Sequence, residues 1–209
     1  MDSSKAPAER SVKGNVILDY VKMIRANPHL PWKELLKPEE WEQINRLILP
    51  ASWYPLPLFQ RVGLAVFKLV AKENYALLHA YGRSLADQMH ADNPGLVVKG
   101  RPRDTLHKYR AIQDRLYSFK GLDTVDISPQ HMIAYIYSQP EDIGIPVYLE
   151  QISGTIERLV ELSGGRQVQV KLIESVLKGA KQNTLEITWE EGHSPNSNRD
   201  VACDQSKGY

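Results

Sequence analysis

The chain has 209 residues, of which 42% are hydrophobic and 24% are charged, a composition typical of a globular protein with one sizeable core. Its 26 Lys and Arg residues against 25 Asp and Glu residues give a formal net charge of +1, without the basic excess of a nucleic-acid-binding protein. The single cysteine, Cys203, cannot form an internal disulfide, which fits a reducing compartment. We therefore expect a cytoplasmic protein with no nucleic-acid partner.

The two ends of the chain have little to bury. Residues 1–11 are small, polar and charged, and residues 191–209 lack apolar periodicity. We expect disordered tails on either side of one domain that covers residues 12–190. No apolar run reaches the roughly 18 to 20 residues of a membrane span, so we expect no membrane insertion.

The first part of the chain carries apolar residues at helical spacing. The first predicted helix begins near Val16 and stops near Asn27-Pro28, and the others cover 32–36, 38–48, 58–71, 73–90 and 103–117. Glycine inside a helix costs about 1 kcal/mol relative to alanine. Gly63 and Gly82 lie inside two of these helices, and we expect helix backbones to approach each other closely there.

The stretch ILPASWYPLPLF, residues 48–59, separates two of these helices. Its three prolines remove backbone donors, so neither a helix nor a central strand is expected to run through it. We predict a rigid connector. Its Trp53-Tyr54 pair either plugs the core where the helices meet the sheet or lines a ligand pocket.

After residue 130, the spacing of the apolar residues changes from a helical pattern to the alternation that is typical of strands. Residues 131–138 alternate in a way that predicts a central strand covered on both faces, and a helix follows from Pro146 to Gly164-Gly165. Segments 166–175 and 183–190 predict a hairpin with one solvated face. The predicted fold is α+β, with an N-terminal helical layer packed on a small antiparallel sheet and a strand-helix-strand-strand C-terminal half.

No common catalytic motif is present: the chain has no GxGxxG, P-loop, HExxH, CxxC or GxSxG. Its six histidines include no i, i+4 pair, so we predict neither an enzyme nor a metal site. Arg83 is either an anion anchor inside a pocket or an ordinary surface arginine. The basic loop with Lys99, Arg101 and Arg103 is either a solvated loop or a site for phosphate or an acidic partner.

Several motifs together resemble a known family. Over most of residues 12–190, the chain resembles an uncharacterised paralogous family of myxobacterial proteins. The resemblance rests on the segments VKGNVILDYVKMI, WKELLKPEEWEQI, LPASWYP and YGRSLADQ, on a later helix ending in ELSGG, and on a hairpin closing on ITWE. More distantly, the chain is similar to haem nitric-oxide-binding domains, hydrocarbon-binding 4-vinyl-reductase domains and TRAPP-type subunits. The resemblance implies a helical layer beside an antiparallel sheet, with an internal or interfacial pocket.

The resemblance also bears on the cofactor. The haem-binding domains place a ligating histidine on a helix and use a Tyr-x-Ser-x-Arg strand to hold the propionates. His107 has about the place of that ligand, although it also fits a core-edge histidine bonded to a carbonyl or water. The candidate strand, Tyr135-Ile136-Tyr137-Ser138-Gln139, lacks the serine and arginine at those offsets. The final hairpin also lacks the cysteines of the hydrocarbon-binding domains, so we predict no haem or other cofactor and an organic ligand held by apolar contact.

The function expected is a non-enzymatic sensory or regulatory module that binds a small apolar or amphipathic molecule between the helical layer and the sheet. Its predicted aromatic lining is Trp53, Tyr54, Tyr81 and Tyr135, with Arg83 as the polar handle. The alternative is an interaction adaptor that forms a homodimer or docks a regulatory protein without a small ligand. A long apolar cavity would favour the first, and a large exposed apolar patch the second.

Overall fold

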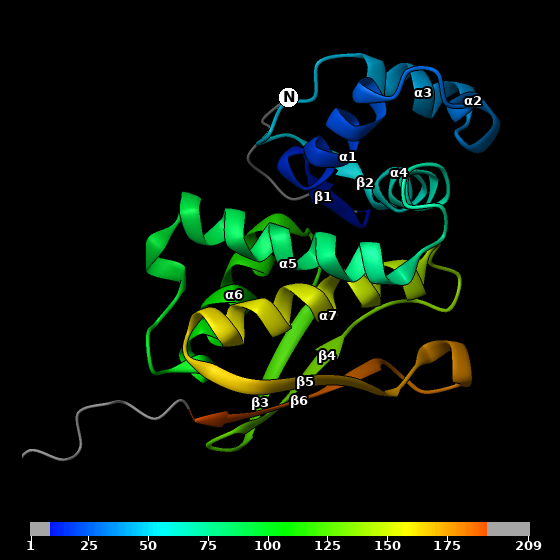
Figure 1. Ribbon diagram of the computed structural model, residues 1–209. Helices are drawn as coiled ribbons and strands as arrows, with labels where there is room; N and C mark the ends of the chain where they lie inside the picture. The colour runs from blue at the N-terminus through cyan, green and yellow to red at the C-terminus, as the bar shows by residue number, and fades with distance from the viewer. Residues whose placement is uncertain (1–8, 192–209) are drawn as a thin grey trace, which may run out of the picture.

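The computed structural model describes residues 9–191, and the predicted mixture of helices and antiparallel sheet is confirmed. The N-terminal half contains β1 (Ser11–Lys13), α1 (Gly14–Ala26), α2 (Trp32–Leu35), α3 (Pro38–Asn45), β2 (Trp53–Pro55) and α4 (Leu56–Leu69). The C-terminal half contains α5 (Tyr75–Asp92), α6 (Pro102–Leu116), β3 (Leu122–Ser128), β4 (His131–Ile136), α7 (Ile145–Leu162), β5 (Gly165–Glu174) and β6 (Asn183–Glu191). The N-terminal half lies over the layer of α5, α6 and α7, and this layer covers the sheet (Figure 1).

Helix α1 is amphipathic and packs on α4 in the core of the N-terminal half. The helix ends at Ala26, as the sequence predicts, because Pro28 disfavours helical conformation in the residue before it. Its buried large side chains are Ile17, Tyr20, Val21 and Ile24.

The third predicted helix is shorter than expected. It was expected to run to Ile48, but α3 ends at Asn45 and Arg46 is already extended. In an extended chain successive side chains point in opposite directions. Leu47 is therefore 78% exposed while Ile48 is buried, although their spacing fits a helix.

The connector forms one strand of a two-stranded sheet. β1 and β2 are antiparallel, with Val12 opposite Tyr54. Tyr54 is buried, and its hydroxyl accepts a hydrogen bond from the backbone N–H of Leu49 at 3.0 Å. No helix runs through residues 48–59, but the helix predicted over 58–71 begins two residues earlier than expected, because α4 starts at Leu56 with a proline in its first turn.

The main sheet has the strand order β3-β4-β6-β5, and every neighbouring pair is antiparallel. The predicted hairpin is β5 and β6, and the predicted central strand is β4. Alternate residues of β4 and β6 join the core under the helices. These core residues are Met132, Ala134, Ile136, Leu185 and Ile187.

The expectation that β4 is covered on both faces is wrong. Met132 and Ala134 are fully buried, whereas on the opposite face only Ile133 is buried, and His131 and Tyr135 are partly exposed. The sequence analysis also missed β3, which pairs with β4 at the edge of the sheet. The sheet therefore has one face covered by helices, with α7 packed against it.

Helices α5 and α7 pack with their backbones unusually close, as expected at Gly82. A Cβ atom added to Gly82 would lie 2.0 Å from the carbonyl oxygen of Gln151, and the hydroxyl of Thr155 donates to the Gly82 carbonyl at 2.9 Å. Gly63 differs from the expectation, because an added Cβ atom there would meet the ring of Tyr20 at 3.1 Å and no backbone.

The folded part begins before residue 12. Arg10 pairs with Asp142 through both carboxylate oxygens at 2.8 and 2.9 Å, and Ser11 already belongs to β1. Residues 1–8 and 192–209, which include most of the two predicted tails and Cys203, lie outside the described residues. Across 9–191, every helix is too short or too polar to cross a bilayer.

Candidate functional site

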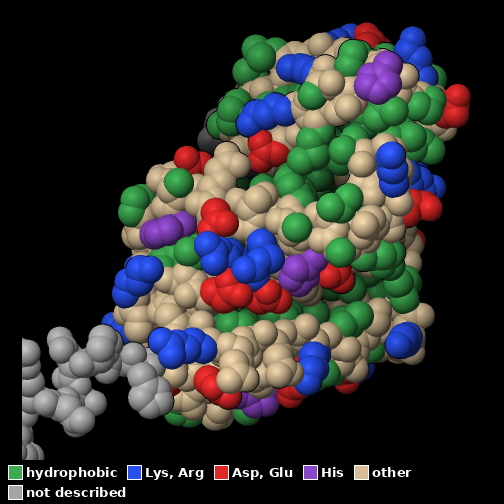
Figure 2. Space-filling model, viewed as in Figure 1, with side chains coloured by type: hydrophobic (Ala, Val, Ile, Leu, Met, Phe, Trp, Pro, Cys, Tyr) green, Lys and Arg blue, Asp and Glu red, His purple; other side chains and the backbone are tan. Residues whose placement is uncertain are grey.

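A cavity of about 530 Å³ lies between the two halves of the molecule. Four helices that are distant in sequence form it: α1, α5, α6 and α7. We call it the central cavity. Figure 2 shows a hollow with hydrophobic side chains at the junction of the two halves. No strand residue lines the central cavity, so it lies one layer above the position expected between helices and sheet.

Four tyrosines line the central cavity, and we call them the tyrosine wall. They are Tyr81 of α5, Tyr109 of α6, Tyr117 directly after α6, and Tyr148 of α7. Burial raises the pKa of each of these phenols. The four hydroxyls therefore stay protonated at neutral pH and can donate hydrogen bonds.

Aromatic contacts connect the tyrosine wall to the N-terminal core. The ring centroid of Tyr20 lies 6.0 Å from that of Tyr81 and 5.7 Å from that of Phe59. Phe59 in turn meets Tyr148 edge-on at 6.4 Å. The hydroxyl of Tyr20 donates to the Oε1 atom of Gln151, a cavity residue of α7. The two halves are therefore joined by packed rings next to the cavity.

The remaining lining mixes aliphatic side chains with polar side chains and with charges of both signs. Leu85 and Met89 of α5 and Ile152 of α7 supply apolar surface. Asp19 and Lys22 of α1 pair with each other at 2.7 Å, and the Lys22 side chain is largely exposed. The arrangement offers apolar walls, phenol donors and no excess charge.

The structure brings only one of the five predicted site residues, Tyr81, to the central cavity. Tyr54 lies in the N-terminal core, where a Cβ atom added to Gly14 would lie 2.9 Å from its ring. Trp53 is partly buried beside β1, with the Nζ atom of Lys13 4.0 Å from its ring centroid. Tyr135 lies on the uncovered face of the sheet.

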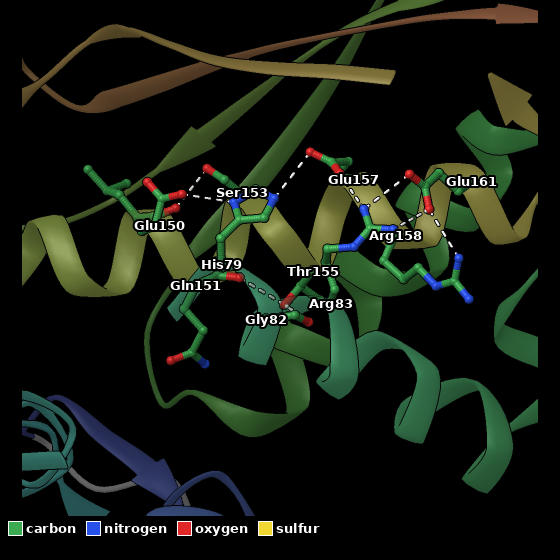
Figure 3. A network of polar contacts seen from close by, with 11 residues as sticks. His79, Gly82, Arg83, Glu150, Gln151, Ser153, Thr155, Glu157, Arg158 and Glu161 are labelled. Carbon is green, nitrogen blue, oxygen red and sulfur yellow. Dashed lines mark hydrogen bonds and ion pairs between the residues drawn. The ribbon is translucent and has the colours of Figure 1, made fainter. Parts of the chain in front are cut away.

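Arg83 occupies the outer side of the α5–α7 pair and does not line the central cavity (Figure 3). Its Nη2 atom lies 2.7 Å from the Oε2 atom of Glu161, and its Nη1 atom pairs with Glu157. Arg158 bonds to the same Glu161 at 3.1 Å. His79 contacts Glu157 at 3.2 Å through Nε2. Figure 2 shows a cluster of basic, acidic and histidine side chains across the middle of this face of the molecule. The position of Arg83 therefore favours an arginine of the protein surface over an anion anchor inside a pocket.

Sequence reasoning missed most of the tyrosine wall. The sequence analysis predicts the helix over 103–117 but singles out neither Tyr109, Gln113 and Tyr117 nor Tyr148. The available signal was a tyrosine and a glutamine one turn apart on a buried helix face, where aliphatic side chains are the usual occupants.

The other chemically interesting residues lie outside the central cavity. His107 points toward β3, where its ring nitrogens lie 3.1 Å from Thr124 Oγ1 and 3.1 Å from Asp126 Oδ1. In the basic loop, Arg101 pairs with Asp104, and Arg103 approaches Asp126 at 3.8 Å. Over residues 9–191 there is no group of three or more His, Cys, Asp or Glu placed to hold a metal ion.

The fold matches solved structures of H-NOX domains. A structure used to probe haem distortion in the H-NOX family has a TM-score of 0.56 at 14% identity, covering 94% of this chain and 100% of that one. An oxygen-binding H-NOX domain related to soluble guanylate cyclases gives 0.57 at 16% identity, covering 86% and 96%. The Fe(II) unliganded H-NOX protein from K. algicida gives 0.58 at 11% identity, covering 86% and 97%. No protein-family model and no curated protein matches the sequence.

The residues of the central cavity do not fit haem. Haem iron needs an axial ligand, usually histidine or cysteine, and two propionates need cationic or hydroxyl partners. None of the described residues that line the cavity is a histidine or a cysteine. Tyr109 would have to ionise to bind iron, and burial raises its pKa. At these identities the H-NOX structures establish a shared fold, and the side chains of the site differ in chemistry from a haem pocket.

Proposed function

We propose that this protein is a non-enzymatic sensory or regulatory module that binds a small apolar or amphipathic molecule in the central cavity. The observation that carries the proposal is the cavity itself. Its volume of about 530 Å³ falls within the range of small-molecule sites, and its walls combine aliphatic and aromatic side chains with polar and charged groups. The H-NOX neighbours, which include an oxygen-binding domain and a structure used to probe haem distortion, support a ligand-binding use of this fold.

The position of the cavity supports a sensory use. Its lining joins α1 of the N-terminal half to three helices of the C-terminal half. A ligand that contacts both halves binds most tightly to one relative arrangement of them, and it shifts the population toward that arrangement. The ligand can in this way change the surface that the protein presents to a regulatory partner.

The adaptor alternative has less support from the surface. The exposed large apolar side chains of the sheet lie on its two opposite edge strands, with Val125 and Ile127 on β3 and Leu172 and Ile173 on β5. β4 and β6 separate the two pairs. These side chains do not form one continuous patch of the kind that marks a docking surface.

Native mass spectrometry of the protein purified from its own host tests the proposal, because it reports both a retained molecule and the oligomeric state. We expect a retained small molecule that is lost in Leu85→Trp, a change that fills the cavity from α5. Leu77→Trp is the matched control, because Leu77 is an exposed residue of the same helix outside the cavity. Equal retention in both variants would contradict the proposed site.

For a ligand that is lost during purification, binding of the neutral fluorescent dye Nile red supplies a second measurement. We expect saturable binding to the unmodified protein and to Leu77→Trp, and strongly reduced binding to Leu85→Trp. No saturable binding to the unmodified protein, together with no retained molecule, would refute the proposed function.

A further inference from the structure

The side chains of the central cavity also indicate the chemistry of its ligand, and this step rests on the function proposed above. Four charged side chains line the cavity, two acidic and two basic. Asp19 and Lys22 already neutralise each other, and Asp92 and Arg115 are both exposed to solvent. A carboxylate or phosphate inside the cavity would lose its hydration without gaining a buried cation, which is costly. The bound part of the ligand is therefore uncharged.

Two buried polar side chains of the cavity lie on α6. Tyr109 is only 4% exposed and Gln113 only 8% exposed, and both line the cavity. Because they are four residues apart, they project from the same face of the helix. Together they place a phenol hydroxyl and a carboxamide on the same side of the cavity.

The phenols of Tyr81 and Tyr109 are free to serve a ligand. Neither has a hydrogen-bond partner among the described side chains, whereas the hydroxyl of Tyr20 is engaged by Gln151. Neither hydroxyl is among the fully enclosed polar atoms that lack a partner in the described residues, so both are accessible to a ligand oxygen that accepts a hydrogen bond. The amide of Gln113 adds two further donors and one acceptor at the same side of the cavity.

The rest of the wall favours a flat aromatic body. The rings of Tyr81, Tyr117 and Tyr148 offer faces and edges for offset or edge-on aromatic contact, and Leu85 and Met89 add aliphatic surface. We infer that the central cavity selects an uncharged aromatic molecule that carries carbonyl-type hydrogen-bond acceptors, which Tyr81, Tyr109 and Gln113 recognise.

Three probes of similar size and flat shape separate this inference from simple apolar binding. Flavone is an uncharged aromatic ketone, 2-phenylnaphthalene is a hydrocarbon, and a carboxylated flavone carries a negative charge. Isothermal titration or fluorescence quenching should give the tightest binding for flavone. Tyr109→Phe should weaken flavone binding by about 3- to 10-fold, the loss expected for one hydrogen bond, and leave hydrocarbon binding within about twofold.

Tyr75→Phe is the matched control, because Tyr75 is an exposed tyrosine of α5 outside the cavity. Gln113→Leu is a second variant with the same expected selectivity, and circular dichroism checks that each variant is folded. Tighter binding of the hydrocarbon or of the carboxylated probe by the unmodified protein would overturn the inference and leave the proposed function intact. An equal loss for flavone and hydrocarbon in both cavity variants would also overturn it. If none of the three probes binds and Nile red does not bind either, the proposed function itself fails.

Discussion

The close approach of α5 and α7 gives a sharp stability prediction for Gly82→Ala. In an ordinary helix this change stabilises by about 1 kcal/mol, because alanine has the higher helix propensity. Here the new Cβ atom would lie 2.0 Å from the carbonyl oxygen of Gln151, a backbone atom that cannot rotate away. The two helices must separate, and the bond of Thr155 to the Gly82 carbonyl lengthens with them. We expect a net destabilisation of roughly 1–3 kcal/mol, the usual range for overpacking.

Urea denaturation followed by circular dichroism measures the free energy of unfolding of each variant. The comparison is valid when the dependence of that free energy on urea concentration is the same in both proteins. Gly154→Ala should behave in the same way, because its Cβ atom would lie 2.3 Å from the carbonyl oxygen of His79. Gly95→Ala is the control, since the nearest atom to its added Cβ is 3.4 Å away on a side chain. A gain in stability for both helix variants would refute the close packing of α5 against α7.

Three further predictions concern the connector, the acid range and haem. Trp53→Ala should lower the free energy of unfolding by roughly 1–3 kcal/mol, less than the loss of a fully buried aromatic ring, because Trp53 is only partly buried. Trp53→Phe should keep most of this stability, because the indole N–H has no hydrogen-bond partner among the described residues. Denaturant melts of both variants check this. Burial by itself would raise the pKa of Glu161, but the hydrogen bonds from Arg83 and Arg158 outweigh burial, and the net pKa is lowered. The free energy of unfolding should therefore fall as the pH drops through the lowered pKa of Glu161. Glu161→Gln should flatten that part of the pH profile. The purified protein should be colourless and gain no Soret band with haem, whereas a stoichiometric band lost in His107→Ala would contradict the assignment of an organic ligand.

The helices could be predicted from sequence because each carries a continuous apolar stripe. α1, α4, α5, α6 and α7 all begin and end within a few residues of the expected positions. The strand β3 could not be predicted in the same way. Only Leu122 of this edge strand is fully buried, and Val125 and Ile127 face solvent, so its alternation carries no apolar signal.

The candidate site was harder to predict than the fold because it depends on which face each residue occupies. Tyr81 and Arg83 were both expected to line one pocket, yet residues two apart on a helix point in different directions. Tyr81 accordingly faces the central cavity, and Arg83 faces the carboxylates of α7 on the outer surface. His107 and Tyr109 on α6 are separated in the same way, the first toward β3 and the second toward the cavity.

The convergence of the four helices could not be read from the sequence at all. The lining residues Val16, Met89, Tyr109 and Ile152 come from helices far apart along the chain, and each helix pattern shows only that one side is buried. Whether such a side closes against a neighbour or borders a space depends on the angles between helices and on the size of every facing side chain.

The H-NOX structures share the fold of this chain but little of its sequence, because core contacts tolerate substitutions that a ligand site does not. Apolar contacts between α7 and the sheet tolerate many substitutions as long as volume and pattern are kept, so the fold persists at 11–16% identity. A ligand site has no such tolerance, because it depends on particular atoms at particular positions. On α6 the buried polar side chains that line the cavity are Tyr109 and Gln113, while the imidazole of His107 faces away toward β3. Under the proposed function these two side chains supply hydrogen-bond donors to the ligand, and Tyr109→Phe and Gln113→Leu test that contribution.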